Sequence, residues 1–401
     1  MGPIPSSDLR SYLLVLVAIC ACGFVLPFSS LIISPLLVDL SRDFDVSLAE
    51  TGQLVVLGAI PGAALSLIVG PVGDLYGRRI MLVGGTMLLG LSLGASALSP
   101  SYGAMVVTRV VTGFAAAALG PAMFAAPADL FVYSVRGRAY GYLQASTTLA
   151  AIVGLPAATL LAAQYGWRWS FAFAAAASIG ASILLLRYPG SSTGTASPLK
   201  TLVTHGYLPV LRAPGARAIL GSSVLLGLAW MGLQTYIGAF FITRYGIGTG
   251  DLAPITALQG VGLLVGSQIA PRLGDRVGYK VIAVWAVAVA AAIEILLIAT
   301  TSTVQIAAAL NFVLAIPMAM RFTSFSMLIS EAVPSARGTM NAMNSTFWAT
   351  GTVIGAYVGG MLVETYGFGA LGVLTAVGSV CSAMVLGRFF PTDKPALRLP
   401  A

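Results

Sequence analysis

The sequence predicts an all-α integral membrane protein with twelve transmembrane helices, arranged as two six-helix bundles related by pseudo-two-fold symmetry. Three observations support this fold class. Hydrophobic residues make up 58% of the 401 residues and charged residues only 8%, with a mean hydropathy of +0.93, whereas a soluble globular protein carries about 25% charged residues. Twelve apolar runs are long enough to cross a bilayer. The two halves of the chain also repeat the same charged loop at a fixed offset.

The twelve apolar runs are bounded by charges or by Pro and Gly clusters. Backbone groups in lipid must be satisfied within a helix or a closed barrel, and the runs are far longer than the ~10-residue alternating strands of a barrel, so they predict helices. The first run is about 26 residues long and is followed by no small-residue cleavage site, so we interpret it as a span and not as a signal peptide. The predicted spans are 12–37, 49–72, 79–98, 103–129, 138–163, 168–187, 216–242, 251–273, 279–300, 304–331, 338–364 and 368–389.

The basic residues indicate how the chain is oriented. With the N-terminus placed in the cytoplasm and twelve alternating spans, sixteen Lys and Arg residues fall on the cytoplasmic side, and only Arg42, Arg168 and Arg244 fall outside. This positive-inside distribution predicts that both termini are cytoplasmic. Because orientation accounts for the net charge of +8, we expect no nucleic-acid partner.

The longest stretch without a span lies between spans six and seven. It begins with PGSSTGTASP, a composition that favours a flexible linker. We therefore expect an N-terminal six-helix bundle over 1–187, a cytoplasmic linker over 188–215 and a C-terminal six-helix bundle over 216–401.

An offset of 201 positions aligns the first half of the chain with the second. The scarce Asp and Arg positions match as well as the glycines, so we interpret the match as an internal repeat. Two six-span halves related in this way are typical of a secondary transporter with a midplane site between the halves. The matched positions include Gly73, Asp74 and Gly77 with Gly274, Asp275 and Gly278, Arg136 with Arg337, and Tyr165–Gly166 with Tyr366–Gly367.

Two motifs resemble the major facilitator superfamily. GPVGDLYGRR at 70–79 resembles the signature of that family between spans two and three, and Arg109 with Gly113 in span four is similar to its Arg-x-x-x-Gly motif. Over 53–79 and 127–141 the chain looks most like bacterial drug or sugar efflux members with proton antiport. The resemblance implies two six-helix bundles that rock around a central cavity. It also implies a monomer among the lipids of the bacterial cytoplasmic (inner) membrane, with a small-molecule substrate and protons as partners.

The repeated loop is a candidate conformational latch. In the family, the Asp of this loop contacts the start of span eleven in the outward-facing state, which here would join Asp74 to Arg337. We expect Asp275 to make the pseudo-symmetric contact with span five. The alternative is that the loop marks topology and forms a solvated turn. The latch set is Gly73, Asp74, Gly77, Arg78, Arg79, Arg136, Asp275 and Arg337.

Three ionisable residues are predicted to lie deep in spans: Arg109, Glu294 and Arg321. Each costs at least ~2.5 kcal/mol at mid-bilayer and is a functional candidate for that reason. The resemblance places Arg109 in the proton-linked network, facing the cavity; the alternative is a structural Arg bonded to carbonyls and to the polar face of span one. Glu294, in the outer half of span nine, could carry a proton, lie against lipid or bond to a neighbouring helix.

Arg321, in AIPMAMRFTSF, lies in the cytoplasmic half of span ten. It has no counterpart in the first half, where Gly120 occupies the matching position. Because a guanidinium binds carboxylate or phosphate in bidentate fashion, a lone Arg in a cavity suits an anionic substrate group. The alternative is gate packing or a salt bridge with Glu331.

Two departures from the family weaken the expectation of proton-coupled export. Span one (SYLLVLVAICACGFVLPFSS) holds no acid, and span five reads Gly154-Leu-Pro156-Ala-Ala instead of the antiporter pattern Gly-Pro-x-x-Gly-Gly. Asp39 or Glu50 at the outer face and Asp129 at the inner end of span four remain as candidate proton carriers. Span eleven instead has a small-residue face that lets helices approach closely, formed by Gly351, Gly355, Gly359 and Gly360.

Uncharged polar and aromatic residues supply candidates for the substrate site. Amides with aromatic rings suit a mostly apolar pocket with a few orienting groups, although each residue alone could equally make a hydrogen bond between packed helices. The candidates are Ser29 and Ser30 in span one, Gln144 and Thr148 in span five, Trp230 and Gln234 in span seven, and Asn341, Asn344 and Trp348 in span eleven.

These features predict a secondary active transporter that works by alternating access, with proton-coupled efflux of a small amphipathic compound as the leading function. The alternative is an organic-anion carrier, for uptake or exchange, that uses Arg109 and Arg321. The only histidine, His205, lies in the linker, and no Ser/His/Asp set, zinc spacing or phosphate loop occurs, so we expect no enzyme, no cofactor and no metal.

Overall fold

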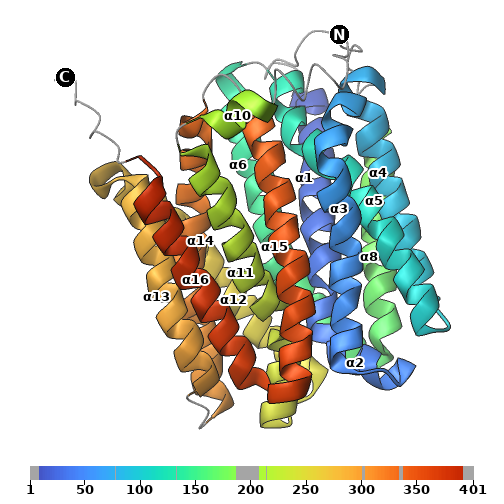
Figure 1. Ribbon diagram of the computed structural model, residues 1–401. Helices are drawn as coiled ribbons and strands as arrows, with labels where there is room; N and C mark the ends of the chain where they lie inside the picture. The colour runs from blue at the N-terminus through green and yellow to red at the C-terminus, as the bar shows by residue number, and fades with distance from the viewer. Residues whose placement is uncertain are drawn as a thin grey trace. The chain divides into compact units, whose positions relative to one another are not determined.

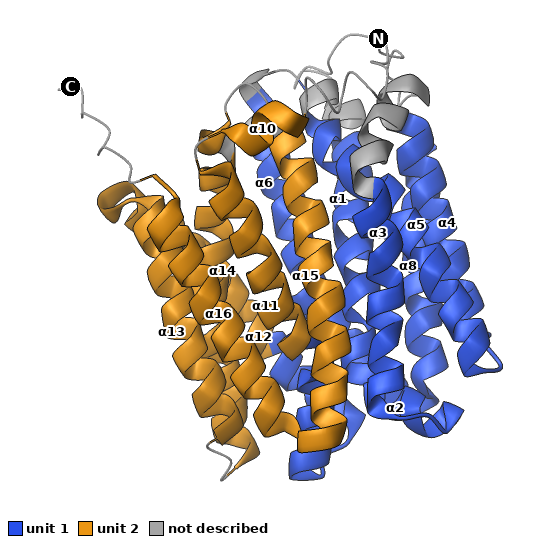
Figure 2. Cartoon of the chain, viewed as in Figure 1, with its two compact units in different colours: residues 1–199, 234–257 blue, residues 200–233, 258–401 orange. Residues whose placement is uncertain are grey.

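The chain forms two compact helical units. The computed structural model describes residues 9–76, 78–131, 133–186, 207–213, 215–299, 303–333 and 337–391. Grouping residues by their contacts gives unit 1, residues 1–199 and 234–257, and unit 2, residues 200–233 and 258–401 (Figure 2).

Unit 1 holds the first six spans, together with the C-terminal part of α11 (Ala216–Tyr245), the short turn η3 (Thr249–Asp251) and the first turns of α12 (Leu252–Val277). Its own helices are α1 (Leu9–Leu31), α2 (Ile33–Phe44), α3 (Leu48–Tyr76), α4 (Arg78–Ala97), α5 (Tyr102–Leu130), α6 (Tyr133–Leu149), the π-helical segment η1 (Ala150–Gly154), α7 (Leu155–Tyr165) and α8 (Trp167–Leu185) (Figure 1).

Unit 2 holds the first part of α11, most of α12 and the last four spans. Its other helices are α10 (Leu208–Arg212), α13 (Tyr279–Ala299), α14 (Val304–Ala332), α15 (Arg337–Tyr366) and α16 (Phe368–Phe389) (Figure 1).

The prediction of twelve spans is confirmed. Twelve stretches of described helix, from Leu13–Leu31 to Phe368–Phe389, are long and apolar enough to cross a membrane by length and composition. Each one overlaps a span predicted from the sequence.

The turn before the last span of each half explains part of the internal repeat. Gly166, between α7 and α8, has a φ of 92°, and Gly367, between α15 and α16, has a φ of 77°. Residues with a Cβ rarely adopt these values, so the same turn requires glycine at both repeat positions. Gly278 of the repeated charged loop also has a φ of 92°, so this turn likewise requires glycine.

Span one, which the sequence predicted as a continuous helix over 12–37, is described as two helices that meet at Ile32, whose own backbone is helical (φ −59°, ψ −27°). α1 ends at Leu31 and α2 begins at Ile33. Pro35 has no N–H to donate to the carbonyl of Leu31, and a Pro in a helix also crowds the preceding turn. α2 then carries Asp39 onward to Phe44.

Glycines allow close helix packing within each unit. In unit 1, a Cβ at Gly113 of the Arg-x-x-x-Gly motif would overlap the carbonyl of Gly58, so α5 and α3 approach to backbone contact. In unit 2, a Cβ at Gly351 or Gly355 would overlap the backbone of α11. The expected close approach along span eleven is therefore confirmed at these two glycines.

The boundaries of the two compact units differ from the predicted domain boundaries. Gly238 of α11 packs against the backbone of Ser34 and Pro35, and the Tyr236 ring fills the space that a Cβ at Gly52 would need. These contacts bring residues 234–257 into unit 1, and the division at 187 and 216 stays a prediction. Residues 188–206 and 214 of the predicted linker lie outside the described residues, and its described part contains α10.

Candidate functional site

Three aromatic rings from three helices of unit 2 form a cluster. The ring of Phe322 on α14 lies 6.0 Å from that of Trp230 on α11 and 5.5 Å from that of Trp348 on α15, measured between centroids, both in edge-on geometry. Trp230 is buried, whereas Phe322 and Trp348 are half-buried. We call Trp230, Phe322 and Trp348 the aromatic cluster. Its half-buried rings can pack against an apolar or aromatic ligand.

The sequence predicted two members of the aromatic cluster and missed the third. Phe322 directly follows Arg321, and adjacent helical positions point about 100° apart. The residue predicted to be functional in span ten was the charged Arg321, although its aromatic neighbour had to lie on a different face of the helix. The angle of about 100° between adjacent helical positions was the signal that could have identified Phe322 as a residue on another face of the helix.

Arg321 is fully buried beside the aromatic cluster on the same helix. Its Nη2 donates to Ser222 Oγ at 2.7 Å, and its Cζ lies 3.6 Å from the centroid of the Phe325 ring. Its Nη1 has no hydrogen-bond partner within the described part of the chain. The suggested salt bridge with Glu331 is wrong, because Arg321 is bonded to Ser222 and not to that carboxylate.

Two serines connect the Arg321 contact to a third helix. The hydroxyls of Ser222 on α11 and Ser382 on α16 lie 2.8 Å apart, and Ser382 Oγ also lies 2.9 Å from the Ser222 carbonyl. One turn beyond Arg321, the buried Ser324 Oγ has no partner among the residues that the structure describes. Since buried polar groups are normally paired, an unpaired guanidinium nitrogen and hydroxyl on one helix indicate room for water or a polar ligand group.

The predicted amides of span eleven are close to this region along the chain but have different environments. Asn344 Oδ1 accepts a hydrogen bond from Ser223 Oγ, which ties α15 to α11. Asn341, one turn earlier on α15, is exposed. Asn344 therefore contributes to helix packing, whereas Asn341 lies exposed on unit 2.

The candidates of spans one and five in unit 1 also separate by exposure. Ser29 is buried, with its hydroxyl donated to the Leu26 carbonyl at 2.7 Å. Ser30 and Gln144 are exposed and Thr148 is half-buried. Three of the four side chains are therefore accessible, although the hydroxyls of Ser30 and Thr148, like that of Ser29, donate to carbonyls of their own helices, at 3.3 Å each.

Span five contains a π-helical segment beside these polar residues. The Leu155 N–H donates to the Ala150 carbonyl, five residues back, over Ala150–Gly154. Pro156 cannot donate the next α-helical bond, so widening the helix re-pairs the backbone. π-helical segments are frequent at functional sites, and this one begins two residues after Thr148.

Arg109 is buried inside unit 1. Its Nη2 donates to Ser96 Oγ of α4 at 2.9 Å, and its Cζ lies 5.2 Å from the Phe171 ring centroid of α8. Its Nε has no partner among the described residues. The guanidinium therefore contacts spans three and six. The sequence had predicted a cavity-facing position or, as the alternative, bonds to carbonyls and to the polar face of span one.

Glu294 is also fully buried, between α13 and α16 of unit 2. Its two carboxyl oxygens lie 3.1 and 3.4 Å from Ser379 Oγ. Of the three positions considered for it, the structure shows bonding to a neighbouring helix. Within the described residues, no cation forms an ion pair with this carboxyl.

Asp39 on α2 joins span one to η3 within unit 1. Its Oδ2 accepts a hydrogen bond from Thr249 Oγ1 at 2.7 Å. Burial raises the pKa of Asp39 above its ordinary value, and the Thr249 bond and the nearby Arg42 offset part of this rise. Close by in unit 1, Ser34 Oγ donates to the Gln234 carbonyl, and the buried Nε2 of Gln234 has no partner among the described residues.

Most of the predicted latch lies outside the described residues. This holds for Gly77, for the surroundings of Gly73 and for the side chains of Asp74, Arg78, Arg136 and Arg337. It also holds for the side chain of the candidate proton carrier Asp129. Two members are described. Arg79 Nη2 donates to the Leu186 carbonyl at 2.6 Å, and Asp275 Oδ1 accepts from the Tyr279 hydroxyl at 2.8 Å.

Twelve described helices that are long and apolar enough to cross a membrane, with buried polar groups inside each unit, indicate a multi-pass membrane protein. The Major Facilitator Superfamily model matches residues 19–267 and 251–401. The chain therefore belongs to the major facilitator superfamily of secondary transporters and has the fold of that family. Because the family is one of transporters, the prediction that the chain is not an enzyme is confirmed.

Curated relatives match the chain over nearly its full length. A chloramphenicol resistance protein of Streptomyces lividans is 27% identical over 391 residues, covering 94% of each chain. An uncharacterised transporter of Bacillus subtilis, YwfA, is 23% identical over 398 residues, covering 96% of this chain and 95% of its own length.

Solved structures share the fold. A D-xylose–proton symporter superimposes with a TM-score of 0.76 at 17% identity, covering 96% of this chain and 99% of its own. A mutant of the nucleoside transporter NupG gives a TM-score of 0.76 at 16% identity, covering 94% and 100%.

Proposed function

We propose that this transporter exports a small amphipathic compound with an aromatic ring in exchange for protons, by alternating access. The observation that carries the proposal is the aromatic cluster, in which Phe322 and Trp348 are half-buried and free to pack against a ligand. A relative named for chloramphenicol resistance supports export of a compound of this kind.

The orientation belongs to the same proposal. The positive-inside distribution and the bacterial relatives support a multi-pass protein of a bacterial cytoplasmic membrane with both termini in the cytoplasm. A contact of Asp74 with Arg337 would latch the cytoplasmic side, and the protein would act as a monomer.

Asp39 is the proposed proton carrier with the best support. The raised pKa of Asp39 brings its titration nearer to neutral pH than that of a free Asp. Binding or release of the proton would alter the hydrogen bond that Asp39 accepts from Thr249. Arg109, Asp129 and Glu294 remain further candidates for the coupling network.

Arg321 supports a second candidate function, an organic-anion carrier. Its fully buried guanidinium has no carboxylate partner within the described residues, and its Nη1 is unpaired. An anionic group of a substrate would satisfy this nitrogen. Uptake or exchange of such anions would also draw on Arg109, whose Nε is likewise unpaired.

A transport assay in proteoliposomes tests the proposal and separates the two functions. Radiolabelled chloramphenicol serves as the neutral aromatic probe and benzoate as the anionic probe. We expect Trp348→Ala to weaken the apparent affinity for the neutral probe by up to about tenfold, the equivalent of a lost ring contact. Trp285→Ala, at a 66% exposed ring on α13, is the matched control and should have no effect. If benzoate is the only probe transported, and its transport is abolished in Arg321→Gln, the protein is an organic-anion carrier and not an efflux carrier.

A further inference from the structure

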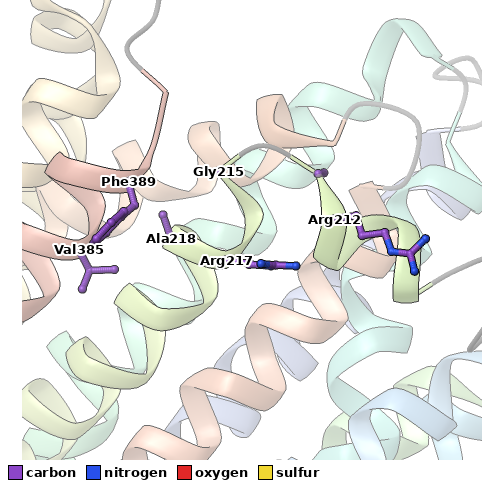
Figure 3. A pocket seen from close by; sticks show the side chains of 7 residues that line it. Arg212, Gly215, Arg217, Ala218, Val385 and Phe389 are labelled. Carbon is purple, nitrogen blue, oxygen red and sulfur yellow. The ribbon is translucent and has the colours of Figure 1, made fainter.

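A pocket lies at one end of unit 2, away from the aromatic cluster along α11. It has a volume of about 470 Å³ and is lined by α10, the turn into α11, the first turn of α11 and the last turns of α16 (Figure 3). In Figure 3, Phe389 and Val385 lie on one side, and Arg217 and Arg212 lie toward the other. We call it the α10 pocket.

The basic wall of the α10 pocket holds two exposed arginines. Arg212 is the last residue of α10, and Arg217 is the second residue of α11. Arg217 Nε donates to the Leu211 carbonyl at 3.0 Å, which holds this side chain against α10. Neither arginine forms an ion pair with a carboxylate among the described residues. Two guanidiniums without acidic partners favour a doubly coordinated oxyanion.

The apolar residues of the pocket and a membrane-facing stripe lie on different faces of α16. Phe389 is 68% exposed. Along α16, Val373, Val377, Val380 and Met384 are also exposed and recur every three or four residues, so they form one face of the helix. In a chain with spans of this length, such a face contacts acyl chains. At 3.6 residues per turn, Phe389 lies on nearly the opposite face of α16 from this stripe, so the exposed ring of Phe389 is itself the apolar group at the pocket.

The turn between α10 and α11 builds the pocket. Gly215 has a φ of 80°, and a Cβ there would come within 2.8 Å of Phe390 and Pro391. Glycine thus lets this turn pack directly against the end of α16. Lys280 Nζ donates to the Phe390 carbonyl at 2.7 Å and fixes the same end. The turn into α11, the Arg217 side chain and the end of α16 are therefore held in a defined arrangement.

We propose that the α10 pocket binds the headgroup of an anionic phospholipid from the cytoplasmic leaflet. The phosphodiester lies against Arg212 and Arg217, and the acyl chains lie against the exposed ring of Phe389. The placement at this leaflet rests on the proposed orientation of the chain. Basic pockets at cytoplasmic helix ends suit anionic lipid headgroups, and the exposed Phe389 distinguishes a lipid from a free anion.

Lipid binding to the full purified chain in detergent tests the proposal without any transport measurement. Native mass spectrometry compares phosphatidylglycerol with phosphatidylcholine of the same acyl chains, and we expect a clear preference for phosphatidylglycerol. The double variant Arg212→Gln/Arg217→Gln should lose roughly thirtyfold in affinity for it. The control Arg272→Gln/Arg276→Gln, two exposed arginines of α12, removes the same charge and should retain binding.

Two further arms separate a lipid site from a simple anion site. Phe389→Ser keeps both arginines and should weaken phosphatidylglycerol binding. Inorganic phosphate and glycerophosphoglycerol, which lack acyl chains, should fail to displace the lipid at equal concentration. The proposal is overturned if both phospholipids bind equally, if the two double variants lose binding equally, or if inorganic phosphate displaces the lipid.

Discussion

The guanidinium of Arg321 is hydrogen-bonded to the hydroxyl of Ser222, with Nη2 2.7 Å from Oγ. A neutral hydroxyl and the face of the Phe325 ring are weak compensation for the hydration that a fully buried cation gives up. Arg321 therefore opposes the stability of unit 2 more than it supports it, which points to a role in binding.

Replacing Arg321 by an apolar residue of similar length should leave the fold intact. In Arg321→Met, Ser222 keeps its hydrogen bond to Ser382, so no hydroxyl is left unpaired, and removal of a poorly compensated charge is neutral or stabilising. We expect an unchanged or higher apparent unfolding temperature together with lost binding of an anionic probe. A clear fall in that temperature would instead make Arg321 a structural residue.

The carboxyl of Glu294 depends on one hydroxyl. Ser379→Ala removes the donor and should lower stability by about 1–3 kcal/mol, the usual penalty for an unsatisfied buried polar group. Glu294→Gln keeps an oxygen acceptor for Ser379 and should be close to neutral. Thermal unfolding of both variants in detergent measures the difference. A loss in Glu294→Gln with none in Ser379→Ala would show that the charge of Glu294, and not its hydrogen bond, matters.

The contact between Asp39 and Thr249 should depend on pH. Burial raises the pKa of Asp39 in the folded protein, so folding favours the protonated form. The contribution to stability is complete below the pKa of the unfolded chain and is lost as pH rises through the folded pKa. At each pH, the amide hydrogen-exchange rate of residues 249–251 in the wild type is divided by the rate in Asp39→Asn. This ratio should therefore rise with pH.

A neighbouring carboxylate supplies the control for this titration. Asp43 is exposed and forms an ion pair with Arg168 at 2.9 Å. Asp43→Asn should leave the pH dependence of exchange at 249–251 as it is in the wild type. A pH dependence that persists in Asp39→Asn would assign it to another group.

Gly355 sets the distance between α15 and α11. In Gly355→Val the new side chain would overlap the backbone of Leu228, which cannot move aside as a side chain can, so we expect lower thermal stability and lower yield. Gly369, on α16, has open space around it. Gly369→Ala should leave stability unchanged or raise it by up to about 1 kcal/mol. Normal stability of Gly355→Val would contradict the close approach.

The spans could be predicted from the sequence because length and hydropathy alone determine them. The interruption between α1 and α2 at Ile32 could not be predicted in this way, because the apolar run continues through Ile32. Pro35 is the only residue in the sequence that signals the interruption. The repeated glycines were informative because their φ values are a local backbone requirement, as at Gly166 and Gly367.

The site was harder to predict than the spans, because it depends on helix rotation. Trp230 and Trp348 were found from residue type, but which ring lay between them was decided by packing. Sequence proximity suggested Glu331 as the partner of Arg321, whereas rotation of α14 directs the guanidinium to α11. The partner of Arg109 likewise came from α4, a helix that carries no charge complementary to it.

Coupled flux of protons and substrate tests the central claim most directly. Wild-type protein in proteoliposomes that contain a pH-sensitive dye is exposed to chloramphenicol at equal internal and external pH. Proton-coupled efflux predicts that substrate moving across the membrane drives protons the opposite way. This proton flux should be reduced in Asp39→Asn and unchanged in Asp43→Asn. Substrate movement with no accompanying proton flux would contradict the account.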